Sequence, residues 1–269
     1  MGVAGNLGMV TGPLIGALLA GLPYASVALC SASAYLIAGA LLATSLPPMR
    51  PEPGEARPGL EGLRIAATDR RFAVFTLLLA GYFLLSSPLS VAVTLKAVGL
   101  YGVGATGPLY GLNAGLAVLL QLPLVRLAGR YLPQRHVLVL GVVLTALALG
   151  LMALAGSFPA LLACVALFSL GTMLVFPTQQ ALTARLARPG LYGSYFGFGA
   201  LSLGVGGALG NVLGGSLSDL GARLGVPALP WLSLMAVGLL AAAGLWLELR
   251  RVPDEGAPST NDAPASQRS

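Results

Sequence analysis

The stretch VLVLGVVLTALALGLMALA at residues 137–155 decides the fold class. It carries no charged residue and no proline, so nothing in it favours water or interrupts a helix. A helix of about 20 apolar residues crosses the hydrocarbon core of a bilayer, which is roughly 30 Å thick. The stretch therefore predicts a membrane-spanning helix.

The whole chain has the same apolar character. Of its 269 residues, 56% are hydrophobic and only 9% are charged, whereas soluble domains carry roughly a quarter charged residues. This composition excludes an ordinary soluble enzyme. Seven more apolar runs of spanning length accompany the first, so we expect an all-α membrane protein with eight transmembrane helices, at residues 3–22, 24–46, 72–95, 105–127, 137–155, 158–182, 194–217 and 229–249.

The basic residues support this zigzag of eight spans. Of the 15 lysine and arginine residues, all but Lys96 and Arg223 fall on one side of it. Because basic loops stay in the cytoplasm, that side is predicted to be cytoplasmic. We therefore expect a multi-pass protein of the cell (inner) membrane with its C-terminus in the cytoplasm.

Two glycine-rich segments form an internal repeat. Residues 8–16, GMVTGPLIG, correspond to residues 206–214, GGALGNVLG. Each segment has three glycines at four-residue spacing, which places them nearly in one row along a helix and lets a second backbone approach closely. The two rows are Gly8, Gly12 and Gly16 in the first predicted span, and Gly206, Gly210 and Gly214 in the seventh.

A repeat of about 200 residues corresponds to six helices, as in transporters built from two related halves. Residues 1–46 would then be the last two helices of an N-terminal bundle, and residues 72–250 a C-terminal six-helix bundle. Residues 47–71, rich in proline and charge, are predicted to be a cytoplasmic linker, and residues 251–269 a disordered cytoplasmic tail. Four helices of the first bundle would be absent before Met1.

The first glycine row also carries a resemblance. Gly8-x-x-x-Gly12-Pro13-x-x-Gly16-Ala17 is similar to the antiporter motif G-x-x-x-G-P-x-x-G-G of the fifth helix in the multidrug efflux, drug:proton antiporter branch of the major facilitator superfamily. Ala17 replaces the last glycine. The resemblance implies that this helix lies between the two bundles and favours export. Pro13 permits a kink there, although tight packing alone would also explain the glycines.

A second, weaker match lies between the fourth and fifth predicted spans. There Arg126 and Arg130 resemble part of the family's cytoplasmic loop motif G-x-L-A-D-R-x-G-R-R, in the loop between its eighth and ninth helices. Gly129 stands where the motif has an acidic residue. The gating role of that acid therefore does not carry over to this chain.

Polar residues at mid-depth are candidates for a substrate cavity. Asn113 and Gln121 are eight positions apart on one predicted helix, so they lie near the same face, and Gln179 is a third candidate. For any single one of them, a hydrogen bond between helices is the more common explanation. No carboxylate lies at mid-membrane, so a proton-carrying group would have to lie in the helices before Met1.

The function expected from the resemblance is secondary active export of small amphipathic compounds by alternating access, with protons as the coupling ion. The partners would be a small-molecule substrate and the lipid bilayer, with no nucleic acid, and the full-length protein would be a monomer. We find no pattern for catalytic residues, a cofactor or a metal. Two alternatives stay open: a metabolite or sugar uptake permease of the same fold, and a truncated remnant that does not transport.

Overall fold

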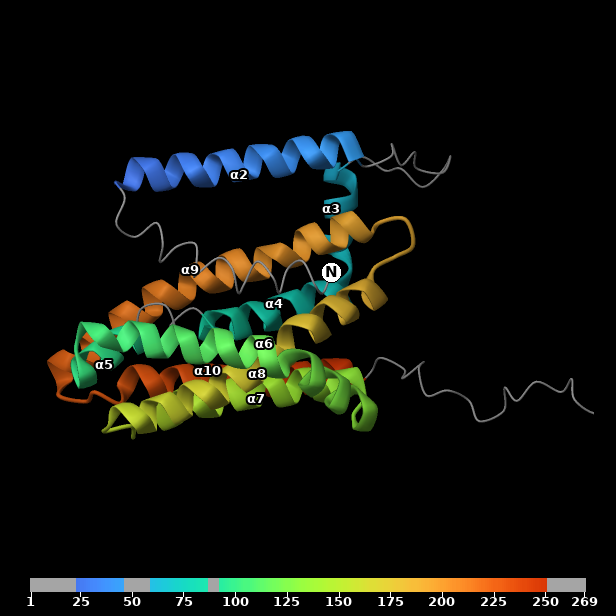
Figure 1. Cartoon of the computed structure of the whole chain (residues 1–269). Coiled ribbons are helices and arrows are strands. Elements are labelled where there is room, and N and C mark those ends of the chain that lie inside the picture. Colours follow the sequence, from blue (N-terminus) through green and yellow to red (C-terminus); the bar gives the residue numbers. More distant parts are fainter. Residues whose placement is uncertain (1–22, 46–58, 87–91, 251–269) are drawn as a thin grey trace, which may run out of the picture.

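The computed structural model describes residues 23–45, 59–86 and 92–250, and this part of the chain is helical (Figure 1). The helices are α2 (Tyr24–Ser45), α3 (Gly59–Thr68), α4 (Arg70–Ser86), α5 (Ala92–Tyr101), the short 3₁₀ helix η2 (Val103–Ala105), α6 (Thr106–Tyr131), α7 (Gln134–Met152), α8 (Phe158–Leu186), α9 (Tyr192–Leu224) and α10 (Leu229–Leu249). Within the described ranges, α2, α6, α7, α8, α9 and α10 are long and apolar enough to cross a membrane.

These six helices match six of the eight predicted spans, with ends that differ by a few residues. The predicted span at residues 3–22 lies outside the described residues. Within the predicted span at residues 72–95, the structure describes α4, up to Ser86, and α5, from Ala92; residues 87–91 between them lie outside the described residues. Six candidate spans are found among the described residues, and the expected total of eight stays a prediction.

The linker predicted at residues 47–71 contains a helix that we did not expect. α3 lies within this segment, and Asp69 separates it from α4. Apolar and polar residues occupy opposite faces of α3, a pattern typical of a helix that lies on another structure rather than one buried in lipid. Residues 251–269, the predicted tail, lie outside the described residues.

Glycines set the closest helix crossings in the bundle. At the crossing of α7 and α8, a Cβ added to Gly141 would lie 2.8 Å from the carbonyl oxygen of Gly171. A Cβ added to Gly171 would lie 2.8 Å from the carbonyl oxygen of Gly141. Because lipid tails are as apolar as leucine, packing between helices, and not escape from water, stabilises such crossings. The two glycines let the backbones of α7 and α8 touch.

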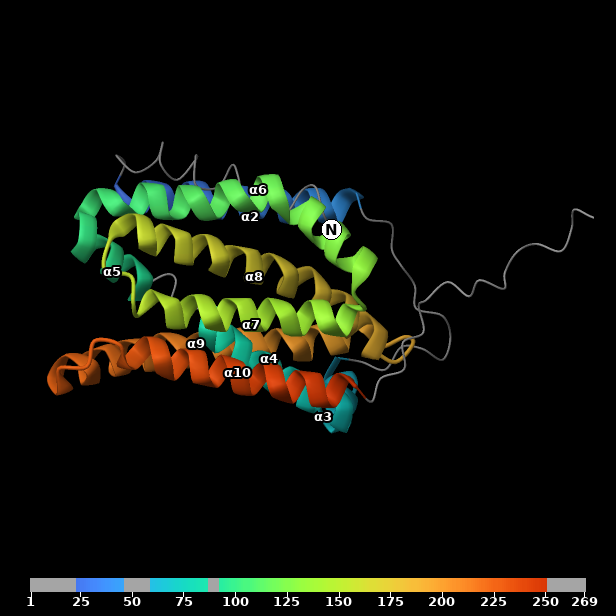
Figure 2. The same ribbon diagram turned by 90° about the horizontal axis from the view of Figure 1, so that it is seen from below.

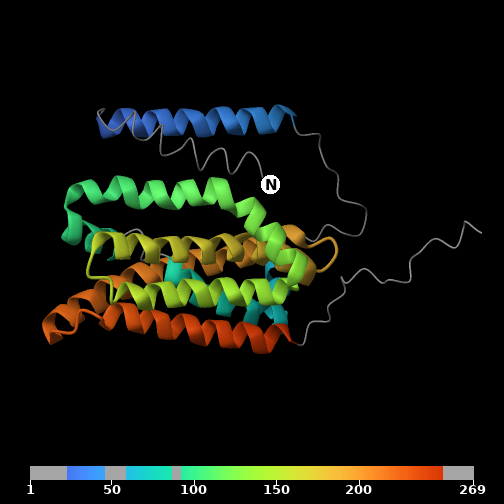
Figure 3. The ribbon, with the colours of Figure 1, turned by 60° about the horizontal axis from the view of Figure 1, so that its bottom comes forward.

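From α6 to α10, successive helices run in opposite directions along the bundle (Figure 2). The α6–α7 turn, the α8–α9 loop and the end of α10 lie together at one end. Arginines border each of these connections, so most of the described positive charge gathers there. α2 runs beside the bundle as a separate rod (Figure 3), and its apolar side chains are exposed, Tyr35 at 81%.

At the opposite end of the bundle, Lys96 of α5 contacts two other helices. Lys96 of α5 donates a hydrogen bond to the carbonyl oxygen of Met152, the last residue of α7. Its ammonium also lies 5.3 Å from the ring centroid of Trp231 at the start of α10. A cation is stabilised at a helix C-terminus and over an indole ring. Lys96 thus ties α5 to α7 and α10.

Candidate functional site

A cavity of about 170 Å³ lies between three helices of the bundle, α4, α8 and α9. Its lining lies in the half of each helix nearer to the α8–α9 loop. The residues that line it are Phe75, Thr76 and Leu79 of α4, Phe176, Gln179, Gln180 and Thr183 of α8, and Phe196, Gly199, Ala200 and Leu203 of α9.

Two residues that line this cavity each have a buried polar atom without a hydrogen-bond partner among the described residues. The hydroxyl oxygen of Thr76 and the amide oxygen of Gln179 are both buried, and neither is bonded to another protein group. The Thr76 side chain belongs to a residue only 6% exposed. A buried polar atom without a partner costs roughly 1–3 kcal/mol, so such atoms in native proteins are usually paired with a ligand or water. Both atoms have almost no accessible surface, so they lie within the packed wall and are not exposed to the cavity.

Aromatic rings form much of the remaining wall. Phe75 is buried behind the cavity at 1% exposure, whereas Phe176 and Phe196 keep 43% and 40% of their surface exposed. Exposed ring faces are available for stacking on an aromatic ligand. None of the described residues that line the cavity is charged. The cavity therefore combines ring surfaces with neutral hydrogen-bonding groups.

The α8 wall contains a proline. Pro177 lies inside the helix, between the cavity residues Phe176 and Gln179. A proline has no N–H to give to the carbonyl one turn earlier, and helices bend most readily at such positions. This part of α8 is therefore the place where the cavity wall is easiest to deform.

The second glycine row fixes the distance between the other two walls. A Cβ at Gly206 would meet the Ala80 carbonyl oxygen and lie 2.8 Å from Phe83 Cβ. A Cβ at Gly210 would meet the Leu84 carbonyl oxygen. Gly214 is buried on the same helix. α9 therefore packs directly against the backbone of α4, one turn beyond the cavity.

The predicted site residues do not all come together. Gln179 lines the cavity. Asn113 and Gln121 lie half-buried on α6 and are not among the residues that line it. The antiporter-motif residues Gly8, Gly12, Pro13 and Gly16 lie outside the described residues.

The predicted loop motif is largely helical. α6 continues to Tyr131, so Arg126 and Arg130 lie on its last turns, where both are exposed. The guanidinium of Arg130 lies 6.0 Å from the ring centroid of the neighbouring Tyr131. The turn between α6 and α7 is confined to Leu132 and Pro133.

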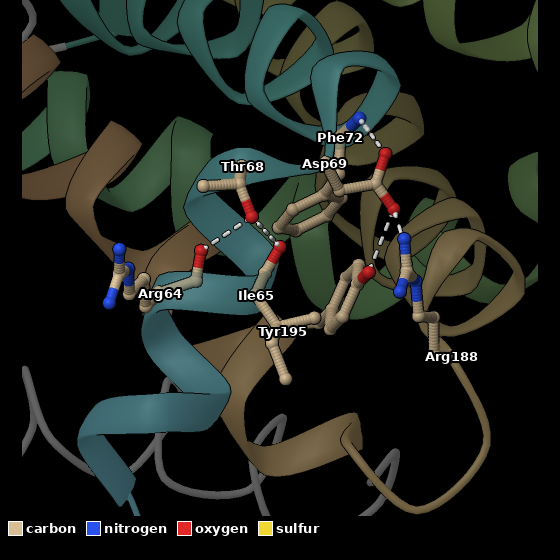
Figure 4. Close-up of polar contacts among 7 residues, drawn as sticks. All are labelled: Arg64, Ile65, Thr68, Asp69, Phe72, Arg188 and Tyr195. Carbon is tan, nitrogen blue, oxygen red and sulfur yellow. Dashed lines mark hydrogen bonds and ion pairs between the residues drawn. The ribbon is translucent and has the colours of Figure 1, made fainter.

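A cluster of polar side chains closes the end of the bundle next to the cavity (Figure 4). The Tyr195 hydroxyl donates a hydrogen bond of 2.8 Å to Asp69 Oδ2. Asp69 Oδ1 accepts a hydrogen bond from the backbone N–H of Phe72, so Asp69 also caps the start of α4. Arg188 Nε lies 3.9 Å from Asp69 Oδ2. Asp69 therefore joins the start of α4 to the α8–α9 loop and the start of α9.

The contributions within this polar cluster differ in strength. Tyr195 is fully buried and its ring packs at a tilt against that of Phe72, with ring centroids 4.6 Å apart, so its hydrogen bond to a carboxylate is shielded from water. Arg188 is 61% exposed, and exposed ion pairs stabilise proteins by about 0–1 kcal/mol. The Tyr195–Asp69 bond is the stronger of the two links.

Sequence reasoning missed this cluster and most of the cavity. An aspartate directly before an apolar helical run is a recognisable helix cap, so Asp69 could have been found in that role. Its partner Tyr195 lies 126 positions away. No local pattern marks Thr76, because a single threonine in an apolar run is unremarkable until the neighbouring helices are placed.

The fold is that of a multi-span helical membrane protein with a cavity between its helices. Residues 103–268 match the family described as Major Facilitator Superfamily, and the chain belongs to this family of transporters. It is therefore a transporter-family protein and not an enzyme.

Its relatives include proteins named multidrug resistance protein MdtH. The chain is 32% identical to the protein of Edwardsiella ictaluri over 242 residues, 90% of this chain and 60% of that protein. It is 33% identical to that of Aeromonas salmonicida, covering 87% of this chain and 59% of the relative. It is 32% identical to the protein of Yersinia pestis, covering 91% of this chain and 61% of the relative. The chain thus spans about 60% of the length of these curated relatives.

Proposed function

We propose that this chain acts in a secondary active transporter that exports small amphipathic compounds by alternating access, driven by protons. The observation that carries the proposal is the cavity between α4, α8 and α9, which is lined by phenylalanine rings and by neutral polar residues. Amphipathic compounds need both kinds of surface. We infer the direction of transport from the names of the relatives, because multidrug resistance by a membrane transporter implies removal of the compound from the cell.

The distribution of charge supports an orientation. Within the described residues, arginines border the α6–α7 turn, the α8–α9 loop and the end of α10, at one end of the bundle. By the positive-inside rule we assign this end to the cytoplasm. The cavity lies in the same half of the bundle, so a compound would enter it from the cytoplasmic side. The C-terminus would also be cytoplasmic.

The packing of the helices suits alternating access. α4 and α9 are in backbone contact at Gly206 and Gly210, whereas α8 carries Pro177 in the middle of the cavity wall. α4 and α9 thus form a rigid pair, whereas α8 can bend. Alternating access requires rigid units that rock around a binding site near the middle of the membrane.

Inverted membrane vesicles test the proposal. We expect vesicles from cells that produce the chain to accumulate radiolabelled chloramphenicol when a proton gradient is imposed. Vesicles from cells without the chain, and vesicles treated with a protonophore, are expected to show no such accumulation. Uptake of a sugar into right-side-out vesicles would instead favour the permease alternative. No accumulation in either kind of vesicle would favour a protein that does not transport.

A further inference from the structure

We propose that a second cavity, between α5 and α9, binds the primary ammonium group of a small amine, with the Asp219 carboxylate as its counter-ion. This cavity has a volume of about 90 Å³, and its lining includes Leu95 of α5 and Asn211, Gly214, Gly215, Ser218 and Asp219 of α9. None of the described residues lines both this cavity and the one between α4, α8 and α9. The proposal therefore concerns a separate site and does not depend on the transport function proposed above.

The polar residues of this cavity share one face of α9. Asn211, Gly215, Ser218 and Asp219 follow the spacing of four, seven and eight positions that places residues on one side of a helix. They lie in the half of α9 that runs toward Leu224, at the end of the bundle opposite the arginine-bordered connections. The helix thus presents a carboxylate, a hydroxyl and an amide to the same small space.

These three groups offer acceptors for hydrogen bonds. The Asp219 carboxylate is an acceptor only. The Ser218 hydroxyl donates its hydrogen to the carbonyl oxygen of Gly214 over 2.7 Å, so its oxygen can accept from a ligand. The amide oxygen of Asn211 is a third acceptor. A primary ammonium has three N–H donors and a positive charge, so it matches this set of groups, and its bond to the carboxylate is charge-assisted.

The negative charge of Asp219 is available to a ligand. Asp219 forms no ion pair or hydrogen bond with another described residue. Lys96 of α5 is engaged by the Met152 carbonyl oxygen and the Trp231 ring. Arg223 lies one turn beyond Asp219, where it is exposed and does not line the cavity. Because α9 is apolar enough to span a membrane, a carboxylate on it is costly unless it faces water or a binding partner.

The size of the cavity favours a short alkyl amine over an aromatic compound. An engineered protein cavity of about 150 Å³ holds one benzene ring, and the volume here is about 90 Å³. A Cβ added to Gly215 would meet nothing within 4 Å, so there is open space beside the backbone at that position. An ammonium group with a short chain fits such a space, whereas a ring does not.

The same lining does not suit a divalent metal ion. Ca²⁺ takes six to eight oxygen ligands, commonly from several carboxylates, and Mg²⁺ demands near-ideal octahedral geometry. Asp219 is the single acid among the described residues that line this cavity. The chemistry of the site therefore points to an organic cation that donates hydrogen bonds.

A cysteine in the cavity reports on its charge. In a chain whose native cysteines, Cys30 and Cys164, are replaced by alanine, Gly215→Cys places a thiol on the lining without a clash. The purified chain is labelled in detergent micelles with an aminoethyl or a sulfonatoethyl methanethiosulfonate. Gly156→Cys, in the exposed α7–α8 connection at the same end of the bundle, is the reference, because a Cβ there also meets nothing within 4 Å. Relative to this reference, we expect the cationic reagent to be favoured roughly tenfold at position 215.

Protection of the same cysteine reports on binding. Labelling by uncharged N-ethylmaleimide is measured at constant ionic strength with increasing propylammonium, tetramethylammonium or sodium. Propylammonium should slow labelling of Gly215→Cys and leave Gly156→Cys unchanged. Tetramethylammonium has the same charge and no donor, and sodium has no alkyl chain, so neither should protect position 215 at concentrations at which propylammonium does.

Two neutralised acids separate recognition from folding. Asp219→Asn, added to Gly215→Cys, should raise the propylammonium concentration that gives half protection roughly tenfold, the effect of losing a charge-assisted hydrogen bond. Glu248→Gln near the end of α10 is the matched control and should leave that concentration unchanged. Because Asp219 is exposed and has no described partner, Asp219→Asn should melt at the same temperature as its parent.

Three results would overturn the inference. The first is labelling at position 215 that propylammonium does not slow. The second is equal protection by propylammonium, tetramethylammonium and sodium, which would indicate a general effect of cations. The third is unchanged protection in Asp219→Asn at an unchanged melting temperature, which would mean that the carboxylate is not the counter-ion.

Discussion

Replacement of Gly206 by alanine should increase the separation between α4 and α9. A Cβ at this position would meet the carbonyl oxygen of Ala80 and lie 2.8 Å from Phe83 Cβ. Nonbonded carbon atoms prefer separations of about 3.5–4.0 Å, so the two helices must move apart by roughly 1 Å. Because one of the atoms met belongs to the backbone of α4, rotation of a side chain cannot relieve the contact.

Gly204 on the same helix provides the matched control. A Cβ at Gly204 would meet nothing within 4 Å. Alanine gains up to about 1 kcal/mol over glycine in a helix interior, and this gain is shared by both variants. The difference between Gly206→Ala and Gly204→Ala therefore isolates the overpacking, which typically costs about 1–3 kcal/mol.

Thermal unfolding of the two variants in detergent micelles measures this difference. For a chain of this size, 1 kcal/mol corresponds to a shift of roughly 2–4 °C in Tm. Gly206→Ala should therefore melt about 2–12 °C below Gly204→Ala. Equal melting temperatures would refute the reasoning, because they would mean that α9 does not rest on the backbone of α4.

Two further predictions concern the ends of the bundle. Tyr195→Phe should lower the free energy of unfolding by about 1–2 kcal/mol, because it removes a buried hydrogen bond to Asp69. Arg188→Gln should lower the free energy of unfolding by less than about 0.5 kcal/mol, because the ion pair is exposed. Equal losses for the two variants in thermal unfolding would contradict this ranking. Lys96→Met should lower Tm by about 2–6 °C through loss of the hydrogen bond to the Met152 carbonyl oxygen. Lys96→Arg keeps the charge, so it should lower Tm by less than Lys96→Met does.

Membrane-spanning segments were predictable because each depends on local composition. An apolar run of sufficient length is stable in lipid wherever the rest of the chain lies. Six predicted spans therefore correspond to helices with only small changes at their ends. The predicted span at residues 72–95 is described in two parts, α4 and α5, and residues 87–91 between them lie outside the described residues.

The cavity was predictable only in part because it depends on three helices at once. Gln179 stood out as a polar group in an apolar helix. Asn113 and Gln121 stood out for the same reason, and their spacing places them on one face of α6, but sequence spacing does not say which neighbour that face meets. Phe196 and Thr76 join Gln179 only after α9 and α4 have packed against α8.

Protection of a cysteine in the cavity tests the central claim most directly. In a chain whose native cysteines, Cys30 and Cys164, are replaced by alanine, Ala200→Cys places a thiol on the cavity lining and Gln121→Cys places one on α6. The rate of maleimide labelling is measured with and without chloramphenicol. We predict that the ligand slows labelling at position 200 and leaves position 121 unchanged. Equal rates at position 200 with and without the ligand would contradict the claim that transported compounds bind between α4, α8 and α9.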